Sequence, residues 1–473
     1  MRRTKIVATL GPGSSSSEVI TEMIRAGVDV FRLNYSHGSH EEQAHRAQLI
    51  RECSESSGRI VGILADLQGP KIRTHKFKEG RVQLIRGETF ILDAALDKNE
   101  GDEERVGITY KDLPKDVKHG DLLLLDDGRV ELEVDEVVAD EIRCKVVYTC
   151  ELSNNKGINL KGGGLSANAL TDKDKKDLKA AVALDVDYIA LSFARTAADV
   201  EHCRELVRAE GSDAGIITKI ERAEAMENID EIIEASDVIM VARGDLGVEM
   251  GDAELPALQK SLIKQARAMN RVVITATQMM ESMIENPIPT RAEVFDVANS
   301  VLDGTDAVML SGETAVGKYP EKTVRAMGRI CEHAELQRAA MVSDHRLDLV
   351  FGRVDEAIAM ATMYTANHLE MKAIASLTES GATVLWMSRI SSGIPIYALT
   401  TRLRTLSRVT LYRGVYPVRT DFTNMSAEDV TLGVVDLLKS KGIVESGDRI
   451  ILTRGDMLGD QGGSNIMKIV SVH

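Results

Sequence analysis

Short apolar runs alternate with amphipathic stretches along much of the chain. The first run covers residues 5–11 and is followed by a serine-rich cap and a helical pattern over residues 19–26. Such runs show little two-residue alternation, which is typical of strands buried on both faces of a parallel sheet. Similar runs follow at residues 28–36, 59–67, 187–194, 214–221, 237–247, 271–278 and 307–314. The eight runs therefore predict an α/β fold, a (β/α)8 TIM barrel, in preference to an open sheet.

The rhythm of strands and helices stops between the third and fourth runs. Residues 71–160 instead carry short alternating segments separated by turns, which predicts an inserted all-β domain. The expected strands are residues 81–85, 89–92, 121–125, 129–134 and 141–147. This insertion ends near Gly162, Gly163 and Gly164, which are as compatible with a plain loop as with a hinge.

A third domain is predicted after a polar linker at residues 344–353. Its mixed helix and strand patterns indicate a compact α/β layer structure. The expected helices are residues 355–369, 383–389 and 427–439, and the expected strands are residues 372–377, 394–399, 416–419, 449–453 and 466–470. The full expectation is a barrel at 1–69 and 170–343, an inserted domain at 70–169 and a C-terminal domain at 344–473.

Composition argues against several classes of function. The 473 residues include no apolar run of the about 20 residues that a membrane helix needs, and the N-terminus has no secretion signal, so we expect a cytoplasmic protein. The net charge of −15 opposes binding to nucleic acid. The five cysteines lie far apart, without the spacing of a zinc site or a disulfide framework.

Polar side chains gather at one end of the predicted strands. Loops at the carboxyl ends of the strands build the active sites of such barrels. A strand end that meets water explains the polarity of any single residue in this set. The whole set contains cations and carboxylates together, which favours an active site. The residues are Asn34, Ser36, Asp66, Ser192, Lys219, Glu221, Arg243, Asp245, Thr277, Ser311 and Glu313.

Two neighbouring strand ends suggest a metal. Lys219 and Glu221 are two residues apart and project to the same face of a strand, and Asp245 follows the next strand beside Gly244. Two carboxylates from adjacent strands suit a hydrated Mg²⁺ that keeps its other positions for substrate oxygens. A simple salt bridge between Lys219 and Glu221 is an equally good interpretation of the spacing.

Two arginines supply candidate phosphate ligands. Arg32 and Arg73 are expected just after the second and third strands, where guanidinium groups grip phosphate bidentately, although surface solvation explains either one alone. His37 is a candidate for a nucleotide contact, although a single histidine in a loop usually has no such role. The residues thus indicate a metal-assisted barrel enzyme for a phosphorylated small acid, without selecting the reaction.

Longer segments select it by resemblance. The chain resembles the pyruvate kinase family throughout the barrel, moderately in the C-terminal domain and loosely in the insertion. The similar segments are KIVATLGP from Lys5, FRLNYSHGSH from Phe31, DLQGPKIRT from Asp66, ITKIER from Ile217, MVARGDLGVE from Met240, TATQMMESM from Thr275, NPIPTRAE from Asn286 and DAVMLSGETAVGKYP from Asp306.

The resemblance implies transfer of a phosphoryl group from phosphoenolpyruvate to ADP, giving pyruvate and ATP. Glu221 and Asp245 would ligate Mg²⁺ or Mn²⁺, and Lys219 would face the phosphoryl group and the enolate. The substrate would also meet Arg32, Thr277, Ala242, Arg243, Gly244 and Asp245. Proton delivery would involve Thr277, Ser311 and Glu313, and ADP would contact Pro12, Asn34, His37 and Arg73.

The resemblance also implies a small β-barrel that closes as a lid, and a homotetramer with Thr290 and Arg291 near a subunit contact. Two departures from the family pattern matter. Lys71 and Leu67 replace the Glu and Thr of potassium-dependent members, so we expect no need for potassium and count Lys71 among the catalytic residues. Glu379 replaces a lysine of the animal form that responds to fructose bisphosphate, so that effector is in doubt.

A sugar monophosphate is the expected activator. Hydroxyls and amides at a predicted helix start suit phosphate, with the loop at residues 454–464 folding over the sugar; an ordinary helix cap and hairpin is the alternative. The expected effector residues are Thr378, Ser380, Gly381, Thr383 and Arg454.

Two other functions compete. A lyase or aldolase of pyruvate enolate would share the metal carboxylates but would need neither the ADP contacts nor the inserted domain. A catalytically silent metabolite sensor is disfavoured by the intact Lys219, Glu221, Asp245 and Thr277.

Overall fold

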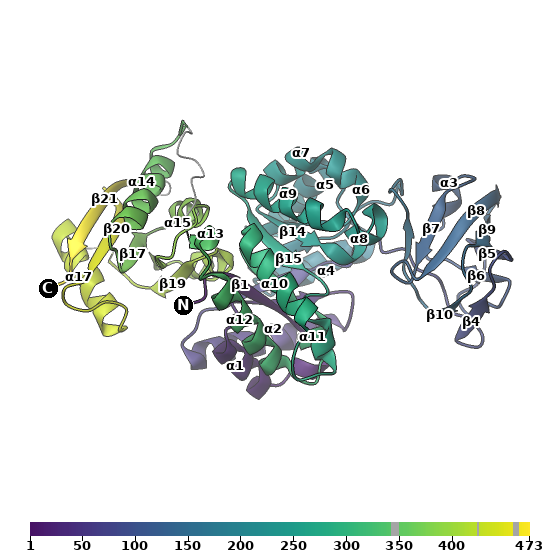
Figure 1. The fold of residues 1–473 in the computed structure, drawn as a ribbon, viewed down its shortest axis with the longest axis horizontal. Coiled ribbons are helices and arrows are strands. Elements are labelled where there is room, and N and C mark those ends of the chain that lie inside the picture. Colours follow the sequence, from purple (N-terminus) through teal and green to yellow (C-terminus); the bar gives the residue numbers. More distant parts are fainter. Residues whose placement is uncertain (342–349, 423–424, 457–462) are drawn as a thin grey trace. The chain divides into compact units, whose positions relative to one another are not determined.

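The computed structural model describes residues 1–341, 350–422, 425–456 and 463–473 (Figure 1). Two compact units make up the chain. The first contains Met1–Ala65, Ala183–Ile189 and Ile263–His473, and the second contains Asp66–Val182 and Ala190–Leu262. Most of the predicted linker, residues 344–349, lies outside the described residues, as do residues 457–462 of the predicted effector loop.

Eight parallel strands close into a barrel, which confirms the prediction. Their order around the barrel is β1-β16-β15-β14-β13-β12-β3-β2, so both ends of the set meet. The strands are β1 (Lys5–Leu10), β2 (Val30–Asn34), β3 (Gly62–Asp66), β12 (Tyr188–Leu191), β13 (Gly215–Ile220), β14 (Val238–Ala242), β15 (Val272–Ala276) and β16 (Ala307–Leu310). Nearly all of their residues are buried, as expected for strands enclosed by helices.

The helices between these strands begin and end where local chemistry permits. Helix α1 starts after Ser16, whose Oγ accepts a hydrogen bond from the amide of Val19 (3.3 Å), and it ends at Gly27 with φ of 119°. The other barrel helices are α2 (His40–Ser57), α4 (Asp172–Ala183), α5 (Ala197–Ala209), α6 (Ala223–Glu227), α7 (Ile229–Ala235), α8 (Arg243–Met250), α9 (Leu255–Ala268), α10 (Arg291–Asp303), α11 (Gly312–Ala315), α12 (Pro320–Ala334) and α13 (Arg338–Met341).

The largest differences from the predicted strand ends occur at β14 and β16. The expected run over residues 237–247 stops at Ala242, because α8 begins at Arg243 and carries Asp245 in its first turn. The run over residues 307–314 stops at Leu310, and α11 takes Glu313 in the same way. A carboxylate in the first helical turn is favoured by the helix dipole, which the strand prediction neglected.

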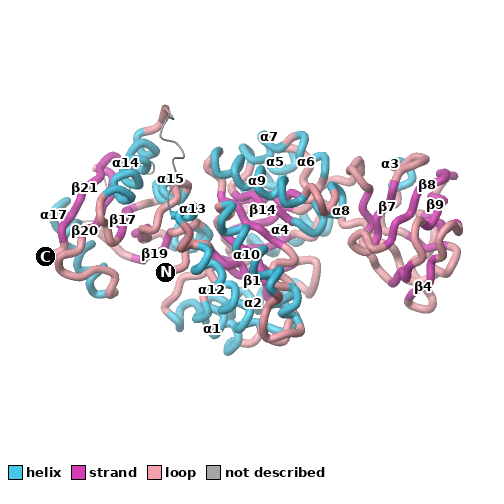
Figure 2. Tube along the Cα trace, viewed as in Figure 1, coloured by secondary structure: helices cyan, strands magenta, loops and turns pink. Residues whose placement is uncertain are grey.

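The insertion is a β domain in two sheets around one core. A six-stranded sheet has the order β11-β7-β8-β9-β5-β6, and a two-stranded sheet pairs β10 with β4, so the expected small β-barrel does not form a single closed ladder. The inserted domain also contains one short helix, α3 (Leu113–Asp116), which is labelled in Figure 2. The strands are β4 (Arg81–Leu84), β5 (Thr89–Asp93), β6 (Arg105–Gly107), β7 (Leu122–Leu125), β8 (Val130–Val138), β9 (Glu141–Val146), β10 (Cys150–Ser153) and β11 (Ile158–Leu160).

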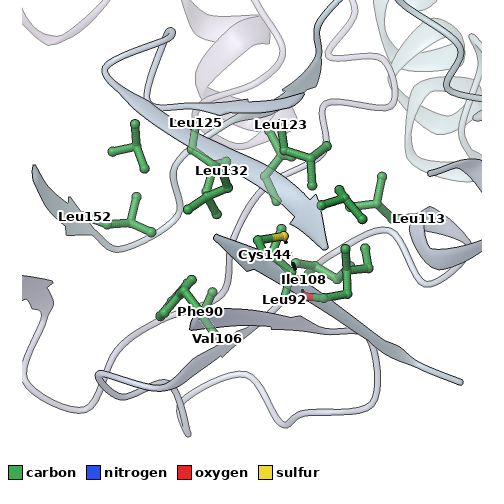
Figure 3. Close-up of a cluster of buried hydrophobic side chains, with 14 of the residues drawn as sticks. Phe90, Leu92, Val106, Ile108, Leu113, Leu123, Leu125, Leu132, Cys144 and Leu152 are labelled. Atoms are coloured by element: carbon green, nitrogen blue, oxygen red, sulfur yellow. Dashed lines mark hydrogen bonds between the residues drawn. The ribbon is translucent and has the colours of Figure 1, made fainter. Parts of the chain in front are cut away.

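Figure 3 shows the core of this insertion, in which side chains of both sheets meet. Leu152 of β10 belongs to the same buried cluster as Phe90 of β5 and Leu132 of β8. The insertion therefore has a hydrophobic core of its own, as an independent domain requires.

The C-terminal segment forms a five-stranded sheet of order β19-β18-β17-β20-β21, in which only β21 is antiparallel to its neighbour. Valines and leucines of α17 pack on this sheet. The elements are α14 (Val354–His368), β17 (Ala373–Leu377), α15 (Ala382–Ser388), β18 (Ile396–Thr400), α16 (Leu403–Arg408), β19 (Val415–Arg419), α17 (Ala427–Ser440), β20 (Arg449–Gly455) and β21 (Ser464–Ser471). Helix α16 was not predicted.

A buried ion pair joins this segment to the barrel within the first unit. Arg389, after α15, donates from Nη1 to Oδ2 of Asp306 (2.9 Å), and the two side chains are 0% and 1% exposed. Asp306 directly precedes β16.

Among the described helices, none combines the length and the apolar character required to cross a bilayer.

Candidate active site

Lys219 lies at the centre of a charged cluster in the second unit. Its Nζ is 2.9 Å from Oε1 of Glu221 and 3.4 Å from Oδ1 of Asp66, and it donates to Oγ of Ser192 (2.7 Å). The three partners belong to three strand ends, β13, β3 and β12. The structure thus contains the Lys219–Glu221 salt bridge and adds two partners that sequence spacing did not reveal.

Glu221 is almost fully buried, and its second oxygen is held by the backbone. Oε2 accepts a hydrogen bond from the amide of Phe193 (2.9 Å), and Phe193 adopts a positive φ of 57° to present that amide. Burial raises the pKa of Glu221, Lys219 opposes this rise, and the charges of Asp245 and Asp66 add to it. Such backbone strain at a bulky residue is typical of functional sites.

A glycine lets the loop after β3 pass close to this cluster. Gly69 has φ of 67°, and a Cβ there would lie 2.8 Å from Cβ of Ser192 and 2.9 Å from the ring of Phe193. Its amide donates to Oδ1 of Asp174 (2.9 Å), the first-turn aspartate of α4. Any larger residue at this position would displace Ser192 and Phe193 from their partners.

Asp245 contacts the other lysine of the site. Nζ of Lys71 donates to Oδ1 of Asp245 over 3.0 Å, and both side chains are largely but not fully buried. Lys71 lies between the barrel strand β3 and the inserted domain. A cation from the chain itself is therefore present beside a predicted metal ligand.

Glu221 and Asp245, the two predicted metal ligands, follow neighbouring strands of the barrel. Ile220 of β13 pairs with Val241 of β14, so Glu221 and the start of α8 follow neighbouring strands at the same level. Within residues whose placement is described, no group of three or more His, Cys, Asp or Glu side chains could hold a metal. Two protein oxygens and an otherwise open coordination sphere match Mg²⁺ as it binds phosphorylated substrates.

Arg73 contacts the inserted domain, and the residues around Ala242 form the start of a helix. Arg73 donates from Nη1 to the carbonyl of Asn155 (3.0 Å) in the inserted domain, and its backbone bridges to Gly157. Ala242 ends β14, while Arg243 and Gly244 begin α8, so this segment is a helix N-terminus. Helix N-termini attract carboxylate and phosphate groups.

The predicted residues of the first unit form their own groups. Arg32 lies within β2 rather than after it, so the prediction of its position was wrong; it donates from Nη1 to Oγ1 of Thr9 on β1 (3.1 Å). The predicted run over residues 28–36 already contained residue 32, and the half-buried side chain of Arg32 is accommodated within the strand. Thr314 bonds to the carbonyl of the same Thr9 (2.9 Å).

Asn34 organises the turn after β2. Its side-chain Oδ1 accepts from the amide of Ser36 (3.1 Å), and its carbonyl accepts from Gln43 (3.0 Å), which also donates to the carbonyl of His37 (2.8 Å). The side chain of His37 is exposed.

Pro12 begins a 3-10 turn, Pro12–Ser14, after Gly11. A Cβ on Gly11 would lie only 2.5 Å from the carbonyl oxygen of Ala315, so glycine allows this turn to approach α11.

Thr277 has an unusual backbone conformation, whereas Glu313 is a buried carboxylate. Thr277 and Gln278 follow β15 with φ of 71° and 52°, a region that non-glycine residues rarely occupy. Glu313 is 2% exposed and accepts from the amides of Met280 (3.1 Å) and Ser311 (2.7 Å). Burial raises the pKa of Glu313.

The predicted effector residues lie at the start of α15. The hydroxyl of Thr378 accepts from the amide of Gly381 (3.0 Å), the hydroxyl of Ser380 accepts from the amide of Ala382 (3.4 Å), and Thr383 hydrogen bonds with Ser464 (2.8 Å). Arg454 donates to the carbonyl of Gly455 (2.9 Å). Glu379 is paired with Arg402.

Sequence reasoning gave no role to Ser192, Phe193 or Glu249. Ser192 was noted only as a polar strand end, and nothing in its sequence neighbours signals a bond to Lys219. The positive φ of Phe193 has no sequence signal in a residue other than glycine. Glu249 had one, because it lies four residues after Asp245 and therefore on the same face of a helix.

Two family models match the chain. Residues 1–324 match "Pyruvate kinase, barrel domain", and residues 356–470 match "Pyruvate kinase, alpha/beta domain". Pyruvate kinase II of Salmonella typhimurium is 56% identical over 100% of this chain and 99% of the relative. A pyruvate kinase of Buchnera aphidicola is 54% identical with the same coverage. The crystal structure of a pyruvate kinase from Cryptosporidium parvum superposes with a TM-score of 0.92 at 35% identity, covering 100% of this chain and 96% of that one.

Proposed function

The chain belongs to the pyruvate kinase family, and from that premise we propose how its own residues move a phosphoryl group from phosphoenolpyruvate to ADP. The family consists of phosphotransferases that form pyruvate and ATP. The observation that carries the proposal is the cluster of Lys219 with Asp66, Glu221 and Ser192, beside the Lys71–Asp245 pair.

Glu221 and Asp245 would hold Mg²⁺ or Mn²⁺. The buried position of Glu221 and the neighbouring strand ends support this assignment. Bound there, the cation would neutralise charge on phosphoryl and carboxylate oxygens. The N-terminus of α8, from Ala242 to Asp245, would receive the substrate carboxylate, since helix N-termini favour anions.

Lys219 would act on the reacting oxygens. Its ammonium group would stabilise the charge of the phosphoryl group in transfer and of the enolate that remains. Asp66, Glu221 and Ser192 fix its direction before substrate arrives, so little reorganisation is needed. Arg32 and Arg73 would grip phosphates, and Pro12, Asn34, His37 and Arg73 would contact ADP.

Thr277 would direct a proton to the enolate carbon. The strained backbone at Thr277 and Gln278 supports a functional role, because such strain persists mainly where it is used. Ser311 and Glu313 would support the proton path, and the pKa of Glu313, which burial raises, makes its carboxyl group hold a proton more readily than an exposed glutamate does.

Potassium would not be needed. The Nζ of Lys71 lies 3.0 Å from Asp245, and this position supports a role in which the ammonium group would take the place of a bound potassium ion. A tethered cation requires no separate binding step.

Regulation and assembly would involve the other domains and a subunit contact. The domain divisions at residues 69/70, 169/170 and 343/344 would separate the barrel, a closing lid and a regulatory domain. A sugar monophosphate would bind at Thr378, Ser380, Gly381 and Thr383, supported by the hydroxyls gathered there, with Arg454 nearby along β20. The enzyme would be a cytoplasmic homotetramer with Thr290 and Arg291 near a subunit contact.

A two-part assay tests the mechanism. The full-length protein should form pyruvate from phosphoenolpyruvate, ADP and Mg²⁺, measured by coupling to lactate dehydrogenase, and a panel of sugar monophosphates should stimulate it. Exchange of the methyl hydrogens of pyruvate with solvent then isolates proton transfer. Thr277→Ala should lose this exchange more than it loses phosphoryl transfer. Equal loss of both would reject the proton-delivery role, and absence of pyruvate formation would reject the function.

A further inference from the structure

Glu249 is a buried carboxylate outside the reacting cluster. It lies in the last turn of α8, four residues after Asp245, and is 4% exposed. Burying a carboxylate is costly unless hydrogen bonds or opposite charges compensate for the lost water.

The partners of Glu249 come from three segments. Oε1 accepts from Nδ2 of Asn159 on β11 (3.3 Å), and Oε2 accepts from the amide of Ala223 (2.9 Å). The carbonyl of Glu249 accepts from the amide of Gly162 (3.1 Å). Ala223 begins α6 two residues after Glu221. One residue therefore joins the inserted domain, the segment that carries Glu221 and the helix that carries Asp245.

We propose that Glu249 is a positioning residue that sets the separation of the two metal-binding carboxylates and couples it to the inserted domain. The inference rests on the proposed metal site formed by Glu221 and Asp245. Glu249 itself touches no reacting atom in this scheme. It acts by holding α6 and α8 at a fixed distance, because one carboxylate spans both.

Three consecutive glycines with positive φ lie next to the contacts of Glu249. Glycines 162, 163 and 164 have φ of 82°, 82° and 110°, which only glycine adopts readily. A Cβ on Gly163 would lie 2.5 Å from Oε2 of Glu224. Arg222 donates from Nη1 to the carbonyl of Leu165 (2.8 Å), just beyond these glycines.

Two buried polar atoms beside these glycines lack a hydrogen-bond partner within the described parts of the chain. Counting only described residues, Nε of Arg222 and Oε2 of Glu224 are buried without a hydrogen bond. Both side chains also face Glu249 electrostatically, Arg222 lowering its pKa and Glu224 raising it. Polar atoms left unsatisfied in one state are available to re-pair when the inserted domain moves.

Four variants of the full-length protein test the role of Glu249. Glu249→Ala removes both side-chain bonds. Glu249→Gln keeps them, because its oxygen accepts from Ala223 and its amide donates to a flipped Asn159. Asn159→Asp opposes two carboxylates. The double variant Asn159→Asp/Glu249→Gln restores a donor and acceptor pair with the charge moved to residue 159.

The primary measurement is Mn²⁺ binding in the absence of substrates. The electron paramagnetic resonance signal of free Mn²⁺ reports how much of the ion remains unbound. Glu249→Ala and Asn159→Asp should weaken binding about 10- to 100-fold, the range typical when residues that orient metal ligands are lost. Glu249→Gln and the double variant should bind within about threefold of the unmodified protein. Hydrogen exchange at the Gly162 amide should rise only in the two weakened variants.

Controls separate this inference from the metal assignment. Asp93→Asn alters another buried carboxylate, in the inserted domain, and should leave Mn²⁺ affinity unchanged even if stability falls. Asp245→Asn should lose Mn²⁺ affinity. If Asp245→Asn binds normally, the metal site and this inference are both overturned. If Asp245→Asn loses binding while a folded Glu249→Ala does not, or if the double variant fails to restore what Asn159→Asp loses, the role of Glu249 alone is rejected.

Discussion

Lys71 and Asp245 are 174 positions apart in the sequence, yet Nζ of Lys71 donates directly to Oδ1 of Asp245 over 3.0 Å. A side chain expected to replace potassium is thus bonded to a carboxylate expected to bind the divalent metal. One contact therefore joins the residue proposed to make potassium unnecessary and a residue proposed to bind the divalent metal.

Lys71→Glu should make the enzyme respond to potassium. The unmodified protein should keep nearly full activity in potassium-free buffer with a bulky organic cation, because its positive charge is covalently attached. The variant should lose activity there and regain part of it when potassium is added. Lys156→Glu, which breaks a lysine pair with Asp126 in the inserted domain, is the matched control and should show no potassium response. A strong potassium requirement in the unmodified enzyme would contradict the proposal.

Asp245→Asn should raise the Mg²⁺ concentration needed for half-maximal activity and lower kcat together. The substitution removes the charge of one of the two carboxylates proposed to bind the metal. It also removes the anionic partner of Lys71. Steady-state kinetics at a series of Mg²⁺ concentrations measures both effects. Asp252→Asn, just beyond α8, should change neither. Unaltered metal dependence in Asp245→Asn would remove Asp245 from the metal site.

Lys219→Met should lower kcat far more than it raises KM for phosphoenolpyruvate. An electrostatic contact made to charge that develops in the transition state typically contributes about 10²-fold or more to the rate. Lys179→Met, which breaks a pair with Glu210 on the surface, serves as control. A change confined to KM would show that Lys219 only binds substrate.

Glu249→Gln should flatten the dependence of folding stability on pH. Burial raises the pKa of Glu249 from its ordinary 4.5 to about 7, so the native state holds the proton more tightly than the unfolded state. This stabilisation is complete below pH 4.5 and is lost as pH rises to about 7, with a slope of at most about 1.4 kcal/mol per pH unit. Urea unfolding of both proteins between pH 5 and pH 8 measures the difference, and parallel curves would refute it.

Arg389→Leu should destabilise the protein by about 3–5 kcal/mol, because it leaves the buried Asp306 carboxylate without its cation. Unfolding by urea, monitored by circular dichroism, gives the change. Arg25→Leu breaks an exposed pair with Glu22 and should cost less than about 1 kcal/mol. Equal effects of the two substitutions would show that burial of the Arg389 pair is not what stabilises it.

The periodicity of the sequence was enough to predict the strands of the barrel and most elements of the C-terminal sheet. Runs such as β1 and β13 consist mostly of apolar residues without a regular polar alternation, and this property is local. The same local spacing predicted that Lys219 and Glu221 lie on one side of β13, where their ammonium and carboxylate groups are 2.9 Å apart.

Strand ends and distant partners required the tertiary structure. The end of β14 at Ala242 depends on where α8 begins, and the bond from Phe193 to Glu221 depends on a positive φ that no side chain announces. The Lys71–Asp245 and Arg389–Asp306 pairs join residues 174 and 83 positions apart. Local sequence sets which backbone conformation and which face each residue prefers, whereas such contacts exist only once the chain has closed the barrel and brought separate strand ends together.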